Sequence, residues 1–387
     1  MKHENIRVVV KHNSLNTIVL GYGGSLYVAL EIASSLNRAG FSTCIKTHLP
    51  RGIAYNILSN AIEYYGLKKD ELKNVEIECK DEDDAILFNA LGDALSGKSH
   101  IAYFHYPVFS NPRTYYPLIP SFYEPFTRQY MWLNRMFKNV LLRDLRIALF
   151  NSSFTYKYLK KYLKGVIKAI VYPPANLIQF YKMEPLSFDE REPIILTVSR
   201  ITYEKNPFNV ILLAWILEKL GLRDWRVVWA GSYGKFSRRI ISEVYTAASK
   251  LGLDPYIEFL VNIPRSELVE LYRRAYLYVH FTEYEHFGIS IIEALAAGTP
   301  VVIPRSSGFW RDFGNIVSPA ALPFSDVTEL YRMVKKLIEK PRIWIHASTL
   351  GRSIAWYFSR YRFHREITKY FLILLKLLGM KKNRGTE

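Results

Sequence analysis

Short apolar runs alternate with longer amphipathic stretches through the first half of the 387-residue chain. The pattern predicts a helix from about Ser25 to Arg38, ended by Gly40. Buried strands are predicted at 6–10, 41–47, 85–91, 100–106, 146–151 and 166–172. Strands that are apolar on both faces and alternate with helices indicate a parallel sheet covered on both sides.

This rhythm stops at 172–193, where four prolines and mixed charges predict a linker. It then restarts as a second α/β unit. Strands are predicted at 193–199, 225–231, 256–261, 277–281 and 300–304, and helices at 207–220, towards 250, at 265–274 and from Gly288–Ser290 to Gly298. Ligands of doubly wound sheets bind beyond the carboxyl ends of the strands, so two facing units predict a cleft between them.

Charge adds one feature that the periodicity does not show. The chain has 52 Lys and Arg against 35 Asp and Glu, a net charge of +17. Such a field attracts nucleic acid, acidic lipid surfaces or phosphorylated substrates. No RNA- or DNA-binding module is recognisable, so we expect no nucleic-acid partner.

The cysteines, the N-terminal residues and the length of the apolar runs bear on the cellular compartment of the protein. Cys44 and Cys79 form no CxxC pair, which predicts neither a disulfide framework nor a zinc site and favours a reducing environment. Residues 1–13 indicate a first strand and not a signal peptide. Because no uncharged apolar run reaches about eighteen residues, we expect no spanning helix and a protein that is cytosolic or rests on a membrane surface.

The richest segment is FTEYEHFGISIIEALAAGTPVVIP, residues 281–304. Glu285 precedes the predicted helix and Glu293 lies about one turn inside it. The helix start offers N–H groups to a phosphate or sugar hydroxyl, and carboxylates accept hydrogen bonds from hydroxyls. Phe287 and Ile289 are expected to point towards the core, while Gly288 lets backbone approach a ligand. Either glutamate alone fits a solvated acid, but the whole string favours a binding site.

Two cations occur in the loop SRITYEKNP, after the first strand of the second unit. Arg200 and Lys205 suit a diphosphate, which an arginine can bind through two parallel hydrogen bonds. Taken alone, a loop of this kind is more often a solvated surface.

In the first unit, the loop GYGGSLYVALEIASSLNRAG leads from the first strand into a helix. It fails the dinucleotide fingerprint because Leu26 replaces the third glycine. Gly23 and Gly24 still permit close approach to a phosphate or acceptor, although a simple tight turn accounts for them equally well.

Two other features follow strands or precede them. His105 ends the strand of IAYFHYPVF, which places it at the cleft, although a hydrogen-bonded core histidine fits as well. The acidic run KDEDD at 80–84 has no histidine or cysteine beside it and is read as a charged loop, not a metal site.

Taken together, these strings resemble family 4 glycosyltransferases of the GT-B fold, whose hallmark is E-x7-E. Glu285 and Glu293 match that hallmark, and Arg200 and Lys205 match the pair that holds the donor diphosphate. Gly23 and Gly24 match the glycine loop of the family, and His105 matches its cleft histidine. Asn151–Ser153 match the end of a strand in its first domain.

The resemblance spans about residues 6–355. It implies two doubly wound Rossmann-like domains facing each other across a cleft, at 1–180 for the acceptor and 181–355 for the donor. A C-terminal helix at 356–387 is expected to return to the first domain, with a basic tail.

Finer strings, FHYP, VYPP and EHFGISIIEALAAG, are similar to the mannosyltransferases that extend the lipid-linked oligosaccharide of asparagine glycosylation. This implies GDP-mannose as donor, an isoprenoid-diphosphate acceptor at the cytosolic membrane face, retention of configuration, and no metal or other cofactor. One departure is that Phe309 and Trp310 follow Gly308 where the family has Gly-Pro, which bears on the sugar pocket and the donor.

By resemblance, Glu285 holds the sugar hydroxyls, Glu293 the ribose, and His105 touches the sugar. The loops that face the base are expected to include Gly231, Val261 and Ile263. Alanine at Glu285 or Lys205 should abolish transfer and leave the melting temperature nearly unchanged.

Alternative functions are a transferase of the same family that uses UDP-glucose or UDP-N-acetylglucosamine on another lipid or polysaccharide, and a sugar-nucleotide epimerase of the same architecture. The segment 104–146, dense in aromatic and basic residues, favours contact with an acidic membrane. The apolar stripe of 363–378 favours packing on the first domain, with membrane contact as the alternative.

Overall fold

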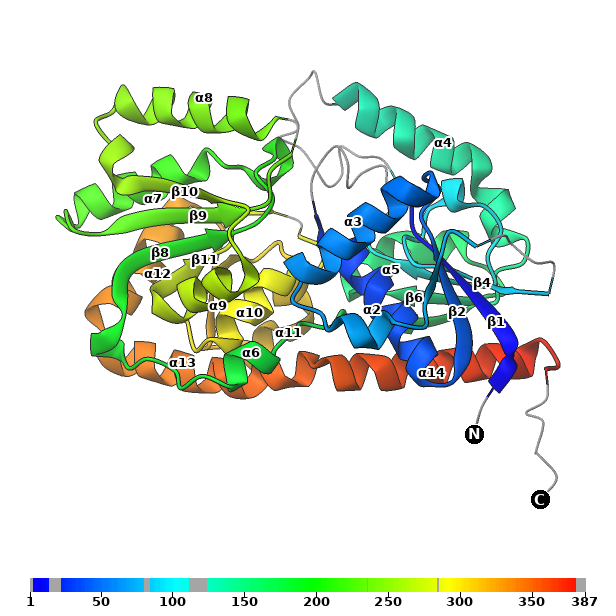
Figure 1. The fold of residues 1–387 in the computed structure, drawn as a ribbon. Helices are drawn as coiled ribbons and strands as arrows, with labels where there is room; N and C mark the ends of the chain where they lie inside the picture. Colours follow the sequence, from blue (N-terminus) through cyan, green and yellow to red (C-terminus); the bar gives the residue numbers. More distant parts are fainter. Residues whose placement is uncertain are drawn as a thin grey trace.

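The computed structural model describes residues 3–13, 22–79, 84–110, 124–234, 236–283 and 285–380. Two parallel sheets form two lobes that lie side by side (Figure 1). The prediction of two helix-covered parallel sheets is therefore confirmed.

The first lobe contains a seven-stranded sheet in the order β3-β2-β1-β4-β5-β6-β7. Its strands are β1 (His3–Lys11), β2 (Phe41–Lys46), β3 (Glu76–Ile77), β4 (Ile86–Asn89), β5 (Ile101–Phe104), β6 (Ile147–Phe150) and β7 (Ile167–Ile170). Its helices are α2 (Gly24–Arg38), α3 (Arg51–Tyr64), α4 (Glu124–Leu142) and α5 (Ser153–Leu159).

The second lobe contains a six-stranded sheet in the order β10-β9-β8-β11-β12-β13. Its strands are β8 (Glu192–Val198), β9 (Arg226–Gly231), β10 (Ile257–Val261), β11 (Ala275–Val279), β12 (Val301–Pro304) and β13 (Ala321–Phe324). Its helices are α6 (Ile178–Tyr181), α7 (Asn209–Lys219), α8 (Ser237–Ser249), α9 (Arg265–Arg274), α10 (Ile289–Ala296), α11 (Gly308–Val317), α12 (Val327–Glu339) and α13 (Pro341–Ala355).

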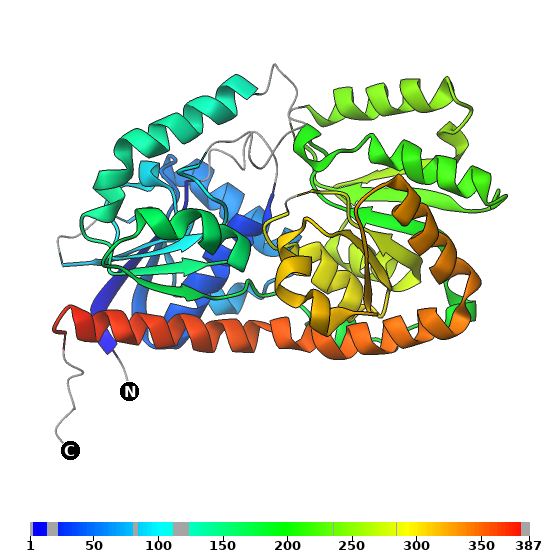
Figure 2. The same cartoon turned by 180° about the vertical axis from the view of Figure 1, so that it is seen from behind.

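The last helix, α14 (Arg360–Leu377), follows α13 along one edge of both lobes and packs on the first (Figures 1 and 2). Its apolar stripe joins the first-lobe core through Phe363, Ile367, Phe371, Leu374 and Leu375. The chain thus crosses between the lobes twice. The crossings pair with each other, since Ala175 N–H donates to the Phe358 carbonyl at 2.9 Å.

The prediction for the cysteines is wrong. Cys44 and Cys79 form a disulfide across the edge of the first sheet, and both are buried. Parallel pairing of β2 with β3 sets Cys44 opposite Glu76 and so brings the segment after β3 next to β2. Linear spacing carries no sign of that pairing, because β3 is only two residues long. The argument for a reducing compartment therefore loses its basis.

Some predicted features fall outside the described residues. They are the acidic run at 80–83, part of the aromatic segment at 111–123, Gly21 of the glycine loop and the basic tail at 381–387. Within the described ranges, no helix is both long and apolar enough to span a bilayer.

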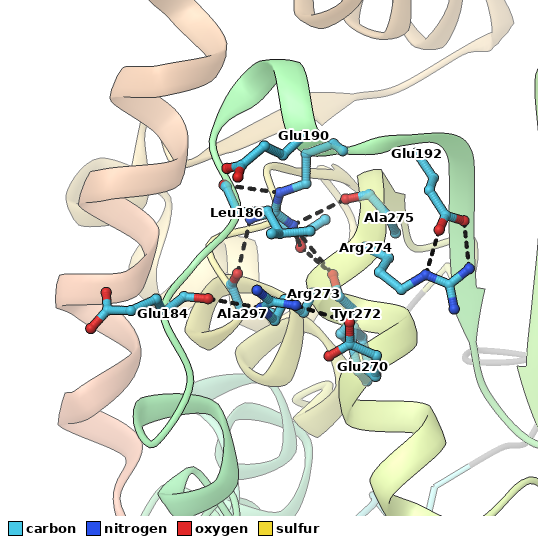
Figure 3. Close-up of polar contacts among 12 residues, drawn as sticks. Glu184, Leu186, Glu190, Glu192, Glu270, Tyr272, Arg273, Arg274, Ala275 and Ala297 are labelled. Atoms are coloured by element: carbon cyan, nitrogen blue, oxygen red, sulfur yellow. Dashed lines mark hydrogen bonds and ion pairs between the residues drawn. The ribbon is translucent and has the colours of Figure 1, made fainter.

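One buried arginine, Arg191, links several elements of the second lobe by hydrogen bonds. Arg191, 7% exposed, precedes β8 and donates to several backbone carbonyls and one hydroxyl. Its acceptors belong to Leu186, Tyr272, Ala275, Ala297, Gly298 and Thr299. Figure 3 shows Leu186, Tyr272, Ala275 and Ala297 gathered around one point, with the Arg274–Glu192 pair beside them. The guanidinium ties the end of α10 to β8 and α9.

We expect Arg191→Ala to lower the free energy of unfolding by about 3 kcal/mol or more, because it leaves buried carbonyls without donors. Chemical denaturation measures the change. Arg274→Ala is the matched control, since its pair with Glu192 is 43% and 36% exposed and should cost about 1 kcal/mol or less. Equal losses in the two variants would contradict this account of the second lobe.

Candidate active site

The two glutamates of the E-x7-E string are both paired with cations. Glu285 lies in the loop between β11 and α10, and its Oε2 is 2.6 Å from Lys205 Nζ. Glu293, inside α10 and 8% exposed, has Oε1 2.6 Å from Arg265 Nη2 at the start of α9. Burying an unpaired carboxylate is costly, so these cations allow both acids to sit at the helix start.

The loop that carries Glu285 needs glycine where it turns into the helix. Gly288 caps α10 in the left-handed region, with φ of 97°, and a Cβ there would lie 2.5 Å from Ile291 Cδ1. The turn places the Glu285 carbonyl 2.6 Å from the N–H of Gly308, at the start of α11. A Cβ on Gly308 would lie 2.2 Å from the His286 carbonyl oxygen, so the starts of α10 and α11 are held close together.

Lys205 ends a short 3-10 helix at Tyr203–Lys205, just after β8. Burial alone would raise the pKa of Glu285, but the Lys205 ammonium and His280, 3.4 Å away, hold that pKa well below its usual range. The carboxylate therefore stays ionised at neutral pH. The charged pair joins the loop after β8 to the loop after β11.

Arg200 lies between the lobes. Its guanidinium contacts Glu204 at 3.4 Å and packs against the glycine loop of the first lobe, where a Cβ on Gly23 would be 3.6 Å from Arg200 Nε. A Cβ on Gly24 would lie 3.2 Å from Ile289 Cδ1. The predicted glycine loop and the predicted cation thus meet across the cleft.

Further polar contacts close the lobes on each other. Ser232 Oγ donates to the Tyr22 carbonyl at 3.2 Å. Asp312 of α11 accepts hydrogen bonds from the N–H, at 2.8 Å, and the hydroxyl of Ser153 at the start of α5. Because these contacts link residues far apart in sequence, the site is assembled only when the lobes are together.

His105 lies at the end of β5, as predicted. Its Nε2 is 2.9 Å from the Ala90 carbonyl, an acceptor, so this nitrogen carries the hydrogen and donates. Burial, together with a smaller contribution from the nearby His286, lowers the pKa of His105 to about 4. The ring is a neutral donor at neutral pH, tied to the first lobe and facing the second.

Three predicted base-contacting positions have packing roles. Gly231 ends β9 where a Cβ would lie 1.8 Å from the Ser199 carbonyl oxygen, so glycine is required for the strands to approach. Val261 and Ile263 pack at the margins of the second-lobe core. Their loop is joined to the β9 loop, since Asn262 N–H donates to the Gly231 carbonyl at 3.0 Å. Their contact with a base stays a prediction.

Phe309 and Trp310, which follow Gly308 where the family has Gly-Pro, do not both point towards the site. Phe309 is fully buried in the second-lobe core beside Phe287 and Phe358. Trp310 packs on Gly314 of its own helix and under the Arg305 guanidinium. The start of α11 is itself buried at Ser307, Gly308 and Phe309, and the Gly308 N–H is bonded to the Glu285 carbonyl.

Sequence reasoning missed several residues of the site. His280 follows β11 in the same position that singled out His105 after β5, so the strand-end criterion would have found it. His286 lies beside Glu285, and its ring is 5.6 Å from that of Phe154 in the first lobe. The pairing of Arg265 with Glu293 had no sequence signal, because it depends on how α9 packs against α10. Among the described residues, no group of three or more His, Cys, Asp or Glu is placed to hold a metal ion.

Comparison with known proteins shows which protein family and which solved structures this chain is similar to. Residues 179–351 match the family described as glycosyl transferases group 1. In the search of solved structures, Anabaena HepE in complex with UDP-glucose has a TM-score of 0.70 at 14% identity, covering 95% of this chain and 100% of that one. Residues 179–351 are therefore similar to group 1 glycosyltransferases, and the two lobes together have the GT-B fold.

Curated relatives narrow the comparison. A human GDP-Man:Man(3)GlcNAc(2)-PP-Dol alpha-1,2-mannosyltransferase is 27% identical over 215 residues, covering 52% of this chain and 44% of the relative. Human alpha-1,3/1,6-mannosyltransferase ALG2 is 24% identical over 243 residues, covering 59% and 58%. The alignments span about half the length of these relatives.

The buried histidines predict a pH dependence of stability. Burial lowers the pKa of His286, like that of His105, to about 4. Between pH of about 6.5 and 4 the unfolded chain takes up protons that the folded chain does not, so stability falls as pH falls through this window. His286→Asn should make the slope of melting temperature against pH shallower there. The exposed His346→Asn is the control, and a slope unchanged by His286→Asn would contradict the prediction.

Proposed function

We propose that the protein transfers a mannosyl group from GDP-mannose to a lipid-linked oligosaccharide, with retention of configuration. The observation that carries the proposal is that the loop 199–207 pairs Lys205 with Glu285 and packs Arg200 against Gly23 of the first lobe. The names of the curated relatives, GDP-mannose-dependent transferases on dolichol-linked glycans, support the donor and acceptor.

Stabilisation of the leaving group is the main chemical demand. Cleavage of the bond from sugar to diphosphate develops negative charge, and preorganised donors stabilise it. Lys205 has three N–H donors, so it can keep Glu285 and also bind a phosphate oxygen. Arg200 and the N–H groups at the start of α10 complete the proposed leaving-group site. With these charges fixed in place, the proposed reaction needs no metal or other cofactor.

The carboxylates position the donor. We assign Glu285 to the sugar hydroxyls and to the cationic transition state, and Glu293 to the ribose. Arg265 holds the Glu293 carboxylate in one orientation, at 2.6 Å. The N–H of the neutral His105 ring is donated to the Ala90 carbonyl, so we assign Nδ1 as an acceptor for a sugar hydroxyl. No protein nucleophile is required, and the acceptor attacks from the side of the leaving group and passes its proton to the departing phosphate.

A UDP-sugar is the second candidate donor, because the HepE structure that shares this fold contains UDP-glucose. The base-facing loops at 231–234 and 261–263 do not distinguish guanine from uracil by their residue types. Transfer assays with GDP-mannose and UDP-glucose, each with a lipid-linked glycan acceptor, decide between the two donors. Transfer from GDP-mannose at a rate at least tenfold higher is the result that we expect.

The Glu285–Lys205 pair gives the sharpest test of the site. Glu285→Gln should reduce transfer by about 10²–10³, the usual effect of losing one preorganised group. Unlike the expectation from sequence, the melting temperature should also fall, because the remaining charge of a pair only 17% and 15% exposed is left unpaired.

The double variant Glu285→Gln, Lys205→Met should recover part of the melting temperature and none of the transfer. The exposed pair Arg226 and Glu258 supplies the matched control, since Glu258→Gln should change neither property. Transfer by the double variant near the wild-type rate would remove these residues from the chemistry.

We also propose that the enzyme rests on the acidic cytosolic face of a membrane through α4. The inner face of α4 is anchored in the first lobe, where Asn134 accepts a hydrogen bond from Ala94 N–H at 2.7 Å. Its outer face exposes Trp132, Met136, Phe137 and Val140, each by 44–55%. Arg135 and Arg143 are exposed on the same helix or just after it. Aromatic, apolar and basic groups in this arrangement suit a headgroup interface.

Trp132→Ser with Phe137→Ser should weaken binding to anionic vesicles by at least tenfold in co-sedimentation at low salt, because the apolar contact is lost. Ile316→Ser with Ile345→Ser, at exposed apolar positions of the second lobe, is the control. No sedimentation of the wild-type protein, or equal binding by both double variants, would end the proposal for α4.

A further inference from the structure

A groove of about 910 Å³ lies along α14, away from the catalytic cleft. It is bordered by the end of α2 and by both chain crossings between the lobes, at 175–178 and 356–361. α14 runs along the opposite edge of the first lobe from α4 in both views (Figures 1 and 2). The groove therefore belongs neither to the donor site nor to the proposed membrane face.

The floor of the groove is held by a buried acid. Glu31 of α2 is fully buried and contacts Arg360 at 2.6 Å and His364 at 2.7 Å, both from α14. Ser35, one turn further along α2, donates to the His364 carbonyl at 3.0 Å. These contacts fix α14 on α2, so the groove is a standing feature of the packed first lobe.

One face of α14 supplies the groove wall. Tyr361, Arg365, Lys369, Ile373 and Lys376 follow each other at intervals of three or four residues and so line up along the helix. This face therefore carries three cations together with one aromatic and one aliphatic side chain. Opposite them, the crossings add Leu177, Ile178 and Trp356.

The charged side chains that line the groove are all basic. None of the described residues that line it is an Asp or Glu. The Glu31 carboxylate beneath is already matched by Arg360 and His364, which leaves the exposed cations Arg38, Arg365, Lys369 and Lys376 around an apolar strip. An apolar channel with cations at its rim is complementary to an anionic amphiphile.

We propose that this groove binds one single-chain anionic amphiphile, with its hydrocarbon chain on Leu177, Leu372 and Ile373 and its carboxylate or phosphate among Arg38, Arg365 and Lys369. The volume lies within the range of about 300–1,000 Å³ that is usual for small-ligand pockets. Because the occupant touches both crossings, it bridges the two connections between the lobes. The proposal is independent of the donor and of transferase activity.

The test uses the full chain and monomeric lipids below their aggregation concentration, with binding measured by calorimetry. Oleoyl lysophosphatidate and oleate should bind with 1:1 stoichiometry, and zwitterionic oleoyl lysophosphatidylcholine at least tenfold more weakly. Arg365→Glu with Lys369→Glu should weaken lysophosphatidate binding at least tenfold. The control, Arg223→Glu with Lys250→Glu, makes the same charge change at exposed positions of the second lobe and should leave binding unchanged.

The contact between the hydrocarbon chain and the groove is tested with Ile178→Glu. This side chain is 48% exposed, so the substitution does not endanger folding. It should also weaken binding. Equal affinity for the anionic and zwitterionic lipids, no 1:1 binding, or equal loss in the control would overturn the proposal. Loss of vesicle binding in the Arg365→Glu, Lys369→Glu variant without any monomer binding would also overturn it, since the face would then dock a bilayer.

Discussion

The site depends on two cations that neutralise two carboxylates held largely away from water at the start of α10. Glu285 is matched by Lys205 from the loop after β8, and Glu293 by Arg265 from α9. Each cation comes from a different element, so the two ion pairs also fix the relative positions of those elements. The start of one short helix thereby gathers backbone N–H groups, two acids and two cations within one small region. The leaving group of the proposed reaction meets charges that are already in place.

Much of this arrangement could be predicted from sequence because it sits at strand ends. Periodicity located β1, β2, β4 to β7 and most second-lobe strands, and it also marked the residues just after them, such as Arg200 and His105. The parallel topology carries this information, since all carboxyl ends of a sheet face the same way. Glu285 and Glu293 were found by their spacing across a predicted helix start.

What the sequence could not supply are contacts between elements distant in the chain. The Arg265–Glu293 pair, the Asp312–Ser153 contact and the Cys44–Cys79 bond each depend on which elements become neighbours. The short strand β3 gives too little periodicity to be read, and with it the disulfide is missed. The rings of Phe309 and Trp310 show a further limit, because helix orientation, not residue type, decides that Phe309 enters the core.

The pairing of the two crossings at Ala175 and Phe358 has a consequence for turnover. Both connections lie together at the edge of the molecule that α13 and α14 follow, so the lobes share one hinge there and separate mainly at the far side. We expect the contacts of Ser232 with Tyr22 and of Asp312 with Ser153 to break before the donor of the proposed reaction enters and again before its nucleoside diphosphate leaves. Each cycle of that proposed reaction then needs two openings of the lobes, and their frequency sets an upper limit on its rate.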